Sequence, residues 1–400
     1  MIAYISSSPI THRESFTFNE VNEINRAGLK IVIFALRNTP KCGNELDKMT
    51  EYTNLFSWNT LKAHIGYLFR FPIRYFKTIL GVLRTDSLKS FYIFIKSVPI
   101  AKRIKELNII HIHSPWASSG ATACWIISKL IHTPFSFTAH AWDLFCGGKI
   151  LKEKMREASF IIAISDYNKK YIIDKFGIEY APKIHVIHCG VDLNEFTLEN
   201  KKPKRKNILS IATFTEKKGT EYLLRAIKLL KDNGNNFEVV ISGVCTDRKE
   251  KQYKRKLESY IKENDLQDNI SIIEKPDRKQ IRSLMRESAL FVLPSIIAEN
   301  GDRDGIPVVL MEAMASGLPV VSTRVSGIPE LVIDNESGIL ANPGNLVDLA
   351  DKMLYLLADS ALQNRLKENA RKKIEEEFDV LKNSNLLRKL FMTSEKIMKV

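Results

Sequence analysis

Residues 294–323 read PSIIAENGDRDGIPVVLMEAMASGLPVVST, and they carry more information about the fold than any other part of the chain. An apolar strand ends near Pro294, a polar loop follows, a helix opens around Pro307, and a second apolar strand covers residues 320–323. Proline suits the first turn of a helix, where its missing N–H would have no partner. The succession of strand, loop, helix and strand is typical of a parallel sheet with helices on its faces.

The polar loop and the start of this helix predict a binding site for an anion. Free backbone N–H groups and the helix dipole favour a diphosphate at this position. Glu312 lies roughly 8 Å further along the helix axis, where its carboxylate can accept hydrogen bonds from ribose hydroxyls. Asp304 precedes the helix and can accept hydroxyls of a sugar on the other side of the diphosphate. The stretch therefore predicts a site for a nucleotide-sugar.

Strands and helices alternate along the rest of the chain in two sets. Apolar runs over 2–5, 29–35, 109–113, 135–140, 160–164 and 185–188 precede ENKKPKRKN (199–207), which is a linker by composition. The second set has runs over 208–212, 237–242, 270–273, 290–294 and 320–323. We predict an α/β protein of two Rossmann-like, doubly wound domains, residues 1–197 and 198–377, that face each other across a cleft.

Several segments resemble one family. Asp304 is followed by seven residues and then by Glu312, which opens the sequence E-A-M-A-x-G-x-P-V-V. This pattern is similar to the E-x7-E signature of retaining glycosyltransferase family 4, whose fold is GT-B. Four further stretches resemble segments of that family: VIHCGVDLNEF (186–196), ILSIATFTEKKGTEYLLRAI (208–227), GIPELVIDNESGIL (327–340) and FTAHAWDLF (137–145). Glu14, Ser15 and Phe16 resemble the S-E-T-F loop of its exopolysaccharide and colanic-acid branch. The resemblance covers nearly the whole chain, and it implies that residues 378–400 pack back on the first domain.

The resemblance also implies roles for individual residues. It makes His140, Lys218 and Asp304 catalytic: His140 lies beside the transferring carbon, Lys218 on the diphosphate and Asp304 on the donor hexose. Glu312 binds the ribose, and the remaining donor-binding positions are Thr213, Gly305, Ile306, Val308 and Val309. Two positions depart from the family: Asp304 stands where Glu is usual, and Thr213 where an arginine usually contacts the diphosphate. Lys218 then carries more of the charge neutralisation.

The predicted reaction moves a hexose with retention from a UDP- or GDP-sugar to an acceptor hydroxyl. Glu14 and His113 are expected on the acceptor side, and the expected acceptor is a lipid-linked oligosaccharide of exopolysaccharide, capsule or O-antigen synthesis. No cofactor and no metal is expected. Asp302-Arg303-Asp304 is formally a metal-binding D-x-D, but it precedes the E-A-M-A helix; His111 and His113 share a strand face without a third ligand at a suggestive spacing.

Charge is concentrated in one segment. The chain has 60 basic and 46 acidic residues, and residues 62–105 contain ten Lys/Arg against a single acid, Asp86, with aromatic residues between them. This pattern favours a helix lying in an acidic membrane interface, while the alternative is an amphipathic helix pair whose aromatics join the core. The five cysteines are scattered, no signal peptide is evident, and no apolar run reaches bilayer length. A cytoplasmic protein, peripheral on the inner face of the plasma membrane and without a nucleic-acid partner, is therefore expected.

Other functions stay open at this point. A sugar-nucleotide epimerase shares the fold but needs acid/base carboxylate pairs. A basic membrane- or nucleic-acid-binding protein without catalysis would explain the charge, but it leaves the ordered set of segments unexplained. A catalytically inactive relative would fit the departures at Thr213 and Asp304.

Overall fold

The computed structural model describes residues 1–11, 14–38, 43–55, 57–85, 88–147, 150–198 and 207–397. It divides the chain into two compact units: unit 1 comprises Met1–His188 with Val380–Val400, and unit 2 comprises Cys189–Asp379. Residues 199–206 of the predicted linker lie outside the described residues.

Unit 1 is built on a seven-stranded parallel sheet with the order β3-β2-β1-β4-β5-β6-β7. Its register pairs Ile2 of β1 with Ile31 of β2 on one side and with His111 of β4 on the other. The strands are β1 (Ile2–Ser6), β2 (Ile31–Ala35), β3 (Thr50–Tyr52), β4 (His111–Ser114), β5 (Phe135–Ala139), β6 (Phe160–Ala163) and β7 (Ile184–Val186).

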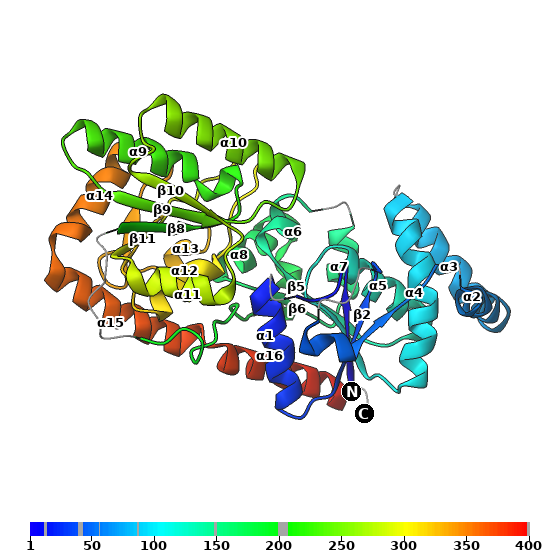
Figure 1. Cartoon of the computed structure of the whole chain (residues 1–400). Coiled ribbons are helices and arrows are strands. Elements are labelled where there is room, and N and C mark those ends of the chain that lie inside the picture. Colours follow the sequence, from blue (N-terminus) through cyan, green and yellow to red (C-terminus); the bar gives the residue numbers. More distant parts are fainter. Residues whose placement is uncertain are drawn as a thin grey trace. The chain divides into compact units, whose positions relative to one another are not determined.

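Helices cover both faces of this sheet, as Figure 1 shows. They are α1 (Ser15–Arg26), α2 (Trp58–Arg70), α3 (Pro72–Leu83), α4 (Leu88–Glu106), α5 (Ser119–Ile131), α6 (Ala141–Phe145), α7 (Leu151–Glu157), α8 (Asp166–Phe176) and α16 (Val380–Ile397), with 3-10 turns η2 (Glu45–Met49) and η3 (Ile178–Lys183).

The side chains of β1 alternate between two separate cores. Ala3 and Ile5 face the larger core with α4 and α5, whereas Ile2 and Tyr4 face the smaller one with α1 and α16. This alternation follows from the period of two in a strand, and burial on both faces explains why β1 is apolar from Ile2 to Ile5. Helix α16, the red helix in Figure 1, lies against α1 and places Phe391 in the smaller core. The end of the chain therefore completes the core of unit 1.

Unit 2 repeats the plan with a six-stranded parallel sheet of order β10-β9-β8-β11-β12-β13. The strands are β8 (Asn207–Ile211), β9 (Glu238–Gly243), β10 (Ile270–Glu274), β11 (Leu290–Leu293), β12 (Val320–Thr323) and β13 (Ile339–Ala341). The helices are α9 (Thr220–Asp232), α10 (Arg248–Glu263), α11 (Arg278–Glu287), α12 (Val308–Ala315), α13 (Ile328–Leu331), α14 (Leu346–Ala358) and α15 (Ser360–Glu377), with the 3-10 turn η4 (Glu216–Lys218).

The predicted fold class, two Rossmann-like doubly wound domains, is confirmed by the two parallel sheets. The apolar runs named from the sequence coincide with strands, with ends that differ by one or two residues. Strands β3 and β13, each three residues long, were not predicted. Among the described residues, the model contains no helix with the length and apolar character that crossing a bilayer requires.

Candidate functional site

Both sheets place their candidate residues at the same kind of position. In each sheet the order reverses between two central strands, β1 and β4 in unit 1 and β8 and β11 in unit 2. Ligands of doubly wound sheets bind beyond the carboxyl ends of the strands at this switch point. In unit 2, Thr213 and Lys218 follow β8, while Asp304 follows β11. The residues predicted for the donor therefore lie on the loops that leave the switch point.

Lys218 and Asp304 form a buried ion pair. The Lys218 Nζ donates to Asp304 Oδ1 over 2.8 Å, and the Ser295 hydroxyl donates to Asp304 Oδ2 over 2.8 Å. Burial acts to raise the pKa of Asp304, but the charges of Lys218 and Lys217 outweigh it and hold the pKa below its ordinary value. Asp304 is thus a carboxylate that accepts hydrogen bonds from Lys218 and Ser295.

A glycine explains why Lys218 points to this place. Lys218 ends η4, and Gly219 follows in the left-handed region with φ 68°. A Cβ on Gly219 would lie 1.8 Å from the carbonyl oxygen of Pro294, at the end of β11. Only glycine allows the two loops to approach this closely, so the Lys-Gly pair joins the loop after β8 to the loop after β11.

Helix α12 begins next to Asp304. It runs from Val308 and has Pro307 as its N-cap in an extended conformation, so Pro307 precedes the first turn instead of opening it as predicted. Gly305 and Ile306 are buried in the loop, while Val308 and Val309 are half-buried in the first turn. The first N–H groups of a helix have no partner within it, so this end of α12 presents donors suited to a phosphate.

Glu312, one turn further along α12, is held by a residue that the sequence did not indicate. The Arg278 guanidinium, at the start of α11, donates to Glu312 Oε1 over 2.6 Å and to both carboxylate oxygens of Glu195. Burial raises the pKa of Glu312, and the charge of Arg278 opposes this. The three residues are too far apart in sequence for spacing to predict their contact.

In unit 1, His140 ends β5 as the N-cap of α6 and lies among aromatic rings. Its ring centroid is 4.2 Å from that of Trp116 and 5.0 Å from that of Phe16. Nε2 donates to the carbonyl oxygen of Pro115 over 3.1 Å, and burial lowers the pKa of the ring to about 4. Glu14 accepts a hydrogen bond from Trp116 Nε1 over 3.4 Å, and burial raises its pKa. The structure thus brings Glu14 and His140 together around one tryptophan.

Asp143 was missed by the sequence analysis, although it lies three residues after His140. Its Oδ2 accepts the backbone N–H of His140 over 3.2 Å and that of Ala117 over 3.0 Å. Burial raises the pKa of Asp143 to about 6. It ties the loop after β4 to the loop after β5 and so positions the His140 backbone.

His113 lies in strand β4 of unit 1. It is fully buried in β4, with Nδ1 2.8 Å from the Ser136 hydroxyl and Nε2 3.4 Å from the Thr138 hydroxyl. Burial is the main reason that the pKa of His113 is well below its ordinary value. Both ring nitrogens are occupied by neighbouring strand residues, which is the environment of a core histidine. The acceptor role predicted for it stays a prediction, and we leave it out of the proposed site.

The two carboxylates of the D-x-D triplet contact two different lysines. Asp302 pairs with Lys217 at 3.0 Å, and Asp304 pairs with Lys218. Within the described ranges, no group of three or more His, Cys, Asp or Glu side chains is arranged to hold a metal ion.

Two family models match this chain, one on each side of residue 195. The model "Glycosyltransferase Family 4" matches residues 14–195, and "Glycosyl transferases group 1" matches residues 194–373. The chain belongs to glycosyltransferase family 4. The family predicted from the sequence is therefore confirmed.

Relatives within family 4 include proteins named for exopolysaccharide synthesis. The amylovoran biosynthesis glycosyltransferase AmsK of Erwinia amylovora is 38% identical over 201 residues, which are 50% of this chain and 48% of AmsK. The provisionally named colanic acid biosynthesis glycosyltransferase WcaL of Escherichia coli K12 is 35% identical over 203 residues, 49% of this chain and 48% of WcaL. The chain thus spans about half the length of these curated relatives.

Solved structures share the family 4 fold over nearly the whole chain. Anabaena HepE, crystallised in complex with UDP-glucose, superposes with a TM-score of 0.74 and 16% identity over 98% of this chain and all of HepE. At this identity the likeness shows the fold.

Proposed function

We propose that this chain transfers a sugar from a nucleoside diphosphate sugar to an acceptor hydroxyl with retention of anomeric configuration. The observation that carries the proposal is the buried Lys218–Asp304 pair beside the start of α12, at the switch point of the second sheet. In a family 4 chain this arrangement supplies a cation, helix N–H donors and a sugar-binding carboxylate within one loop cluster.

The proposed donor is a UDP- or GDP-sugar, and a hexose is the sugar that we favour. The complex of HepE with UDP-glucose supports this choice, since HepE has the same fold. Glu312 would accept the ribose hydroxyls, with Arg278 as its support. The side chain at Thr213 has no charge, so the diphosphate would depend on Lys218 and on the N–H groups around Val308 and Val309.

The chemistry needs mainly electrostatic stabilisation. The bond between the anomeric carbon and the diphosphate oxygen breaks, the acceptor oxygen bonds to the same face of that carbon, and the acceptor proton passes to the leaving phosphate. Negative charge develops on the diphosphate, where Lys218 and the helix start would stabilise it. We therefore propose that the reaction requires no metal, and that Asp304 holds Lys218 in place and binds the sugar.

For unit 1 we propose recognition of the acceptor, with Glu14 and His140 as the principal side chains and His140 next to the reacting sugar. The names of AmsK and WcaL support a role in polysaccharide biosynthesis. Within that role we propose a lipid-linked glycan as the acceptor. A cytoplasmic location agrees with Cys124 and Cys245, which are in no disulfide among the described residues. Cys42 lies outside the described residues.

Calorimetry with UDP, GDP and ADP tests the donor site, on wild type and Glu312→Ala with a chelator present. We expect micromolar binding of one nucleotide and its loss in Glu312→Ala. Glu258→Ala is the matched control, because Glu258 is a carboxylate of unit 2 that also pairs with a cation, Lys254, but lies on α10. Binding by the control together with loss in Glu312→Ala supports the proposal.

Failure of UDP, GDP and ADP to bind to the wild type would overturn the proposed transferase function. If one of them binds, incubation with the corresponding nucleotide-sugar and acceptor separates a transferase from an epimerase. A transferase releases one nucleoside diphosphate for each sugar transferred. An epimerase converts the donor and releases none at completion.

A further inference from the structure

Helix α2 turns its apolar side away from the core. Trp58, Leu61, Ile65 and Phe69 recur at intervals of three and four residues and therefore share one face. Their exposed fractions are 73%, 48%, 46% and 81%. The opposite, buried face carries smaller or more polar side chains, namely Thr60, Ala63 and Tyr67. A helix serving only the core would have these two faces exchanged.

Helix α3 has the same inverted arrangement. Ile73, Phe76, Leu80 and Leu83 lie on one face and are exposed by 69%, 54%, 54% and 56%. The buried residues of α3 are Thr78 and Val82. The alternative that the aromatics of this segment join the core is therefore correct only for some of them, among them Tyr67 and Phe94. The exposed apolar residues continue into α4 with Leu88, Phe91 and Tyr92.

Exposed cations accompany these apolar side chains. They are Lys62, Arg70, Arg74, Lys77, Arg84 and Lys89. In the part of the chain that the structure describes, none of the six pairs with a carboxylate, although Arg70 and Arg74 lie over the ring of Phe71. The surface therefore has unneutralised positive charge next to a large apolar area.

The three helices are held in one arrangement by a half-buried histidine. His64 of α2 has Nδ1 2.8 Å from the Tyr75 hydroxyl of α3, and Nε2 3.0 Å from the carbonyl oxygen of Ile95 in α4. Because a carbonyl can only accept, Nε2 carries the hydrogen and the neutral ring accepts from Tyr75 at Nδ1. Burial lowers the pKa of His64, which favours this neutral form. The exposed apolar face thus belongs to a group of helices that hydrogen bonds of His64 hold together.

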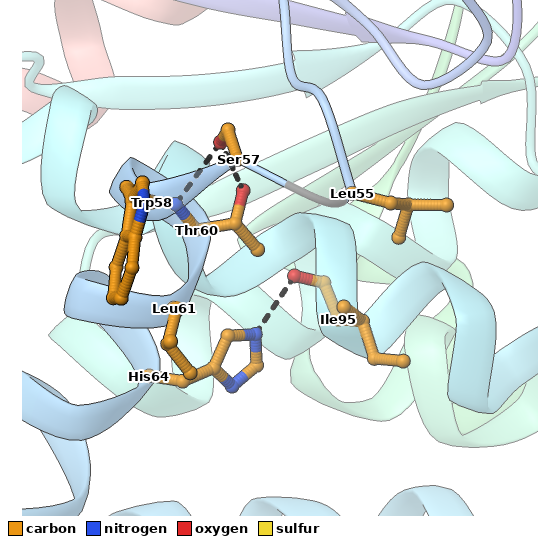
Figure 2. A pocket seen from close by; sticks show the side chains of 7 residues that line it. All are labelled: Leu55, Ser57, Trp58, Thr60, Leu61, His64 and Ile95. Atoms are coloured by element: carbon orange, nitrogen blue, oxygen red, sulfur yellow. Dashed lines mark hydrogen bonds between the residues drawn. The ribbon is translucent and has the colours of Figure 1, made fainter.

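A pocket of about 370 Å³ opens at the start of α2. Figure 2 shows Trp58 and Leu61 on its α2 side and Leu55 and Ile95 opposite, with the His64–Ile95 hydrogen bond between the helices. Trp58 and Leu61 belong both to this pocket and to the exposed face of α2. The apolar surface therefore continues from the helix face into a hollow.

We infer that residues 58–85 and 88–92 form a docking surface for a bilayer that contains anionic lipids. Amphipathic helices that lie in a membrane interface combine exposed Trp, Phe and Leu with Lys and Arg. A nucleic acid could bind to the cations and stack on the aromatic rings, but exposed aliphatic side chains do not contribute to such binding. These side chains are Ile65, Ile73, Leu80 and Leu83. The charge complementarity selects an anionic leaflet, with the cations at the headgroups and the apolar face below them. The inference goes beyond the proposed transferase function and does not depend on it.

Co-sedimentation of the full chain with vesicles tests the surface. One set contains phosphatidylcholine alone and the other adds phosphatidylglycerol; neither contains a glycan acceptor. We expect binding to the anionic set that weakens as salt is raised. The variant Phe69→Asp/Ile73→Asp should lower the partition coefficient about tenfold or more. Arg74→Ala/Lys77→Ala should lower it roughly 30-fold, because each cation near an anionic surface contributes about a factor of five.

Ile178→Asp is the matched control, since Ile178 belongs to the same unit and is 72% exposed, like Ile73, but lies in η3. It should bind vesicles as wild type does, and circular dichroism should show that all variants keep their helix content. Absence of binding to the anionic vesicles would overturn the inference, as would equal binding by Phe69→Asp/Ile73→Asp. Self-association of wild type that this variant abolishes, or binding to DNA that it leaves intact, would instead assign the surface to a second copy or to a polyanion.

Discussion

Replacement of Lys218 by methionine should destabilise unit 2 in a way that depends on Asp304. The two side chains are only 14% and 9% exposed, so the variant leaves a buried carboxylate without its closest cation. Removing one partner of a buried ion pair costs about 3–5 kcal/mol. Ser295 still donates to Asp304, and Lys217 remains near it, so we expect the lower end, about 3 kcal/mol. For a unit of this size, this lowers the Tm by roughly 6–12 °C.

The double variant Lys218→Met/Asp304→Asn should recover most of this loss. Replacing both charges leaves no uncompensated buried ion, and a pair exchanged for neutral groups is often close to neutral in stability. The double variant should still fail to bind a nucleotide-sugar if the donor site is as we propose. The second substitution therefore restores stability but not binding, which separates a structural role from a functional one.

The tryptophans make the assay specific to one unit. All four, Trp58, Trp116, Trp125 and Trp142, lie in unit 1, whereas both units contribute helices to the circular dichroism signal. In urea, Lys218→Met should shift the dichroism transition to lower denaturant and leave the fluorescence transition in place.

The contribution of Asp304 to the stability of unit 2 depends on pH with a defined sign. In wild type the pKa of Asp304 is below its ordinary value, so its contribution to stability is present above the unfolded pKa and is lost as pH falls through the folded one. Without Lys218, burial favours the protonated form of the Asp304 carboxyl. The difference between wild type and Lys218→Met should thus be largest near neutral pH and shrink toward pH values of about 4. An unchanged dichroism transition, or a double variant as unstable as the sum of both single variants, would refute this reasoning.

Three further substitutions have clear expected outcomes. Gly219→Ala should destabilise unit 2 by about 3 kcal/mol or more, seen as an earlier dichroism transition, because its Cβ would meet the carbonyl oxygen of Pro294 at positive φ. Glu20 accepts a hydrogen bond from Tyr4 over 2.9 Å, and burial raises the pKa of Glu20 to about 7, so its contribution to stability is lost as pH rises from the ordinary value through 7. Glu20→Gln should remove this loss, and its free energy of unfolding should exceed that of wild type increasingly up to pH 8, by roughly 3 kcal/mol, which is seen as a higher Tm. Phe391→Ala should cost about 3–5 kcal/mol and shift the tryptophan fluorescence transition in urea, since the ring is fully buried in the smaller core of unit 1; an unshifted transition would mean that α16 is dispensable there.

The architecture was accessible from local pattern. Short apolar runs such as residues 208–212 and 320–323 must be buried on both faces, and alternation with helices leaves little choice but parallel sheets. Position along such a sheet also carries information, because every loop after a strand emerges at the same edge. The family resemblance assigned Lys218 and Asp304, 86 residues apart, to one site, and their 2.8 Å contact lies at this edge.

The contacts between particular side chains could not be predicted in this way, because spacing along the sequence does not determine which side chains meet. Arg278 reaches Glu312 only because the start of α11 lies beside the middle of α12, and the burial of His113 depends on strands β4 and β5 being neighbours. The direction in which α2 and α3 present their apolar residues is the clearest case. Periodicity shows that Trp58, Leu61, Ile65 and Phe69 share a face, but either face of a helix can turn inward, and the choice is made by packing against α4 and α5. The sequence by itself thus determined the two sheets and the loops that carry the site, whereas the tertiary structure decided which charges pair and which apolar face remains exposed.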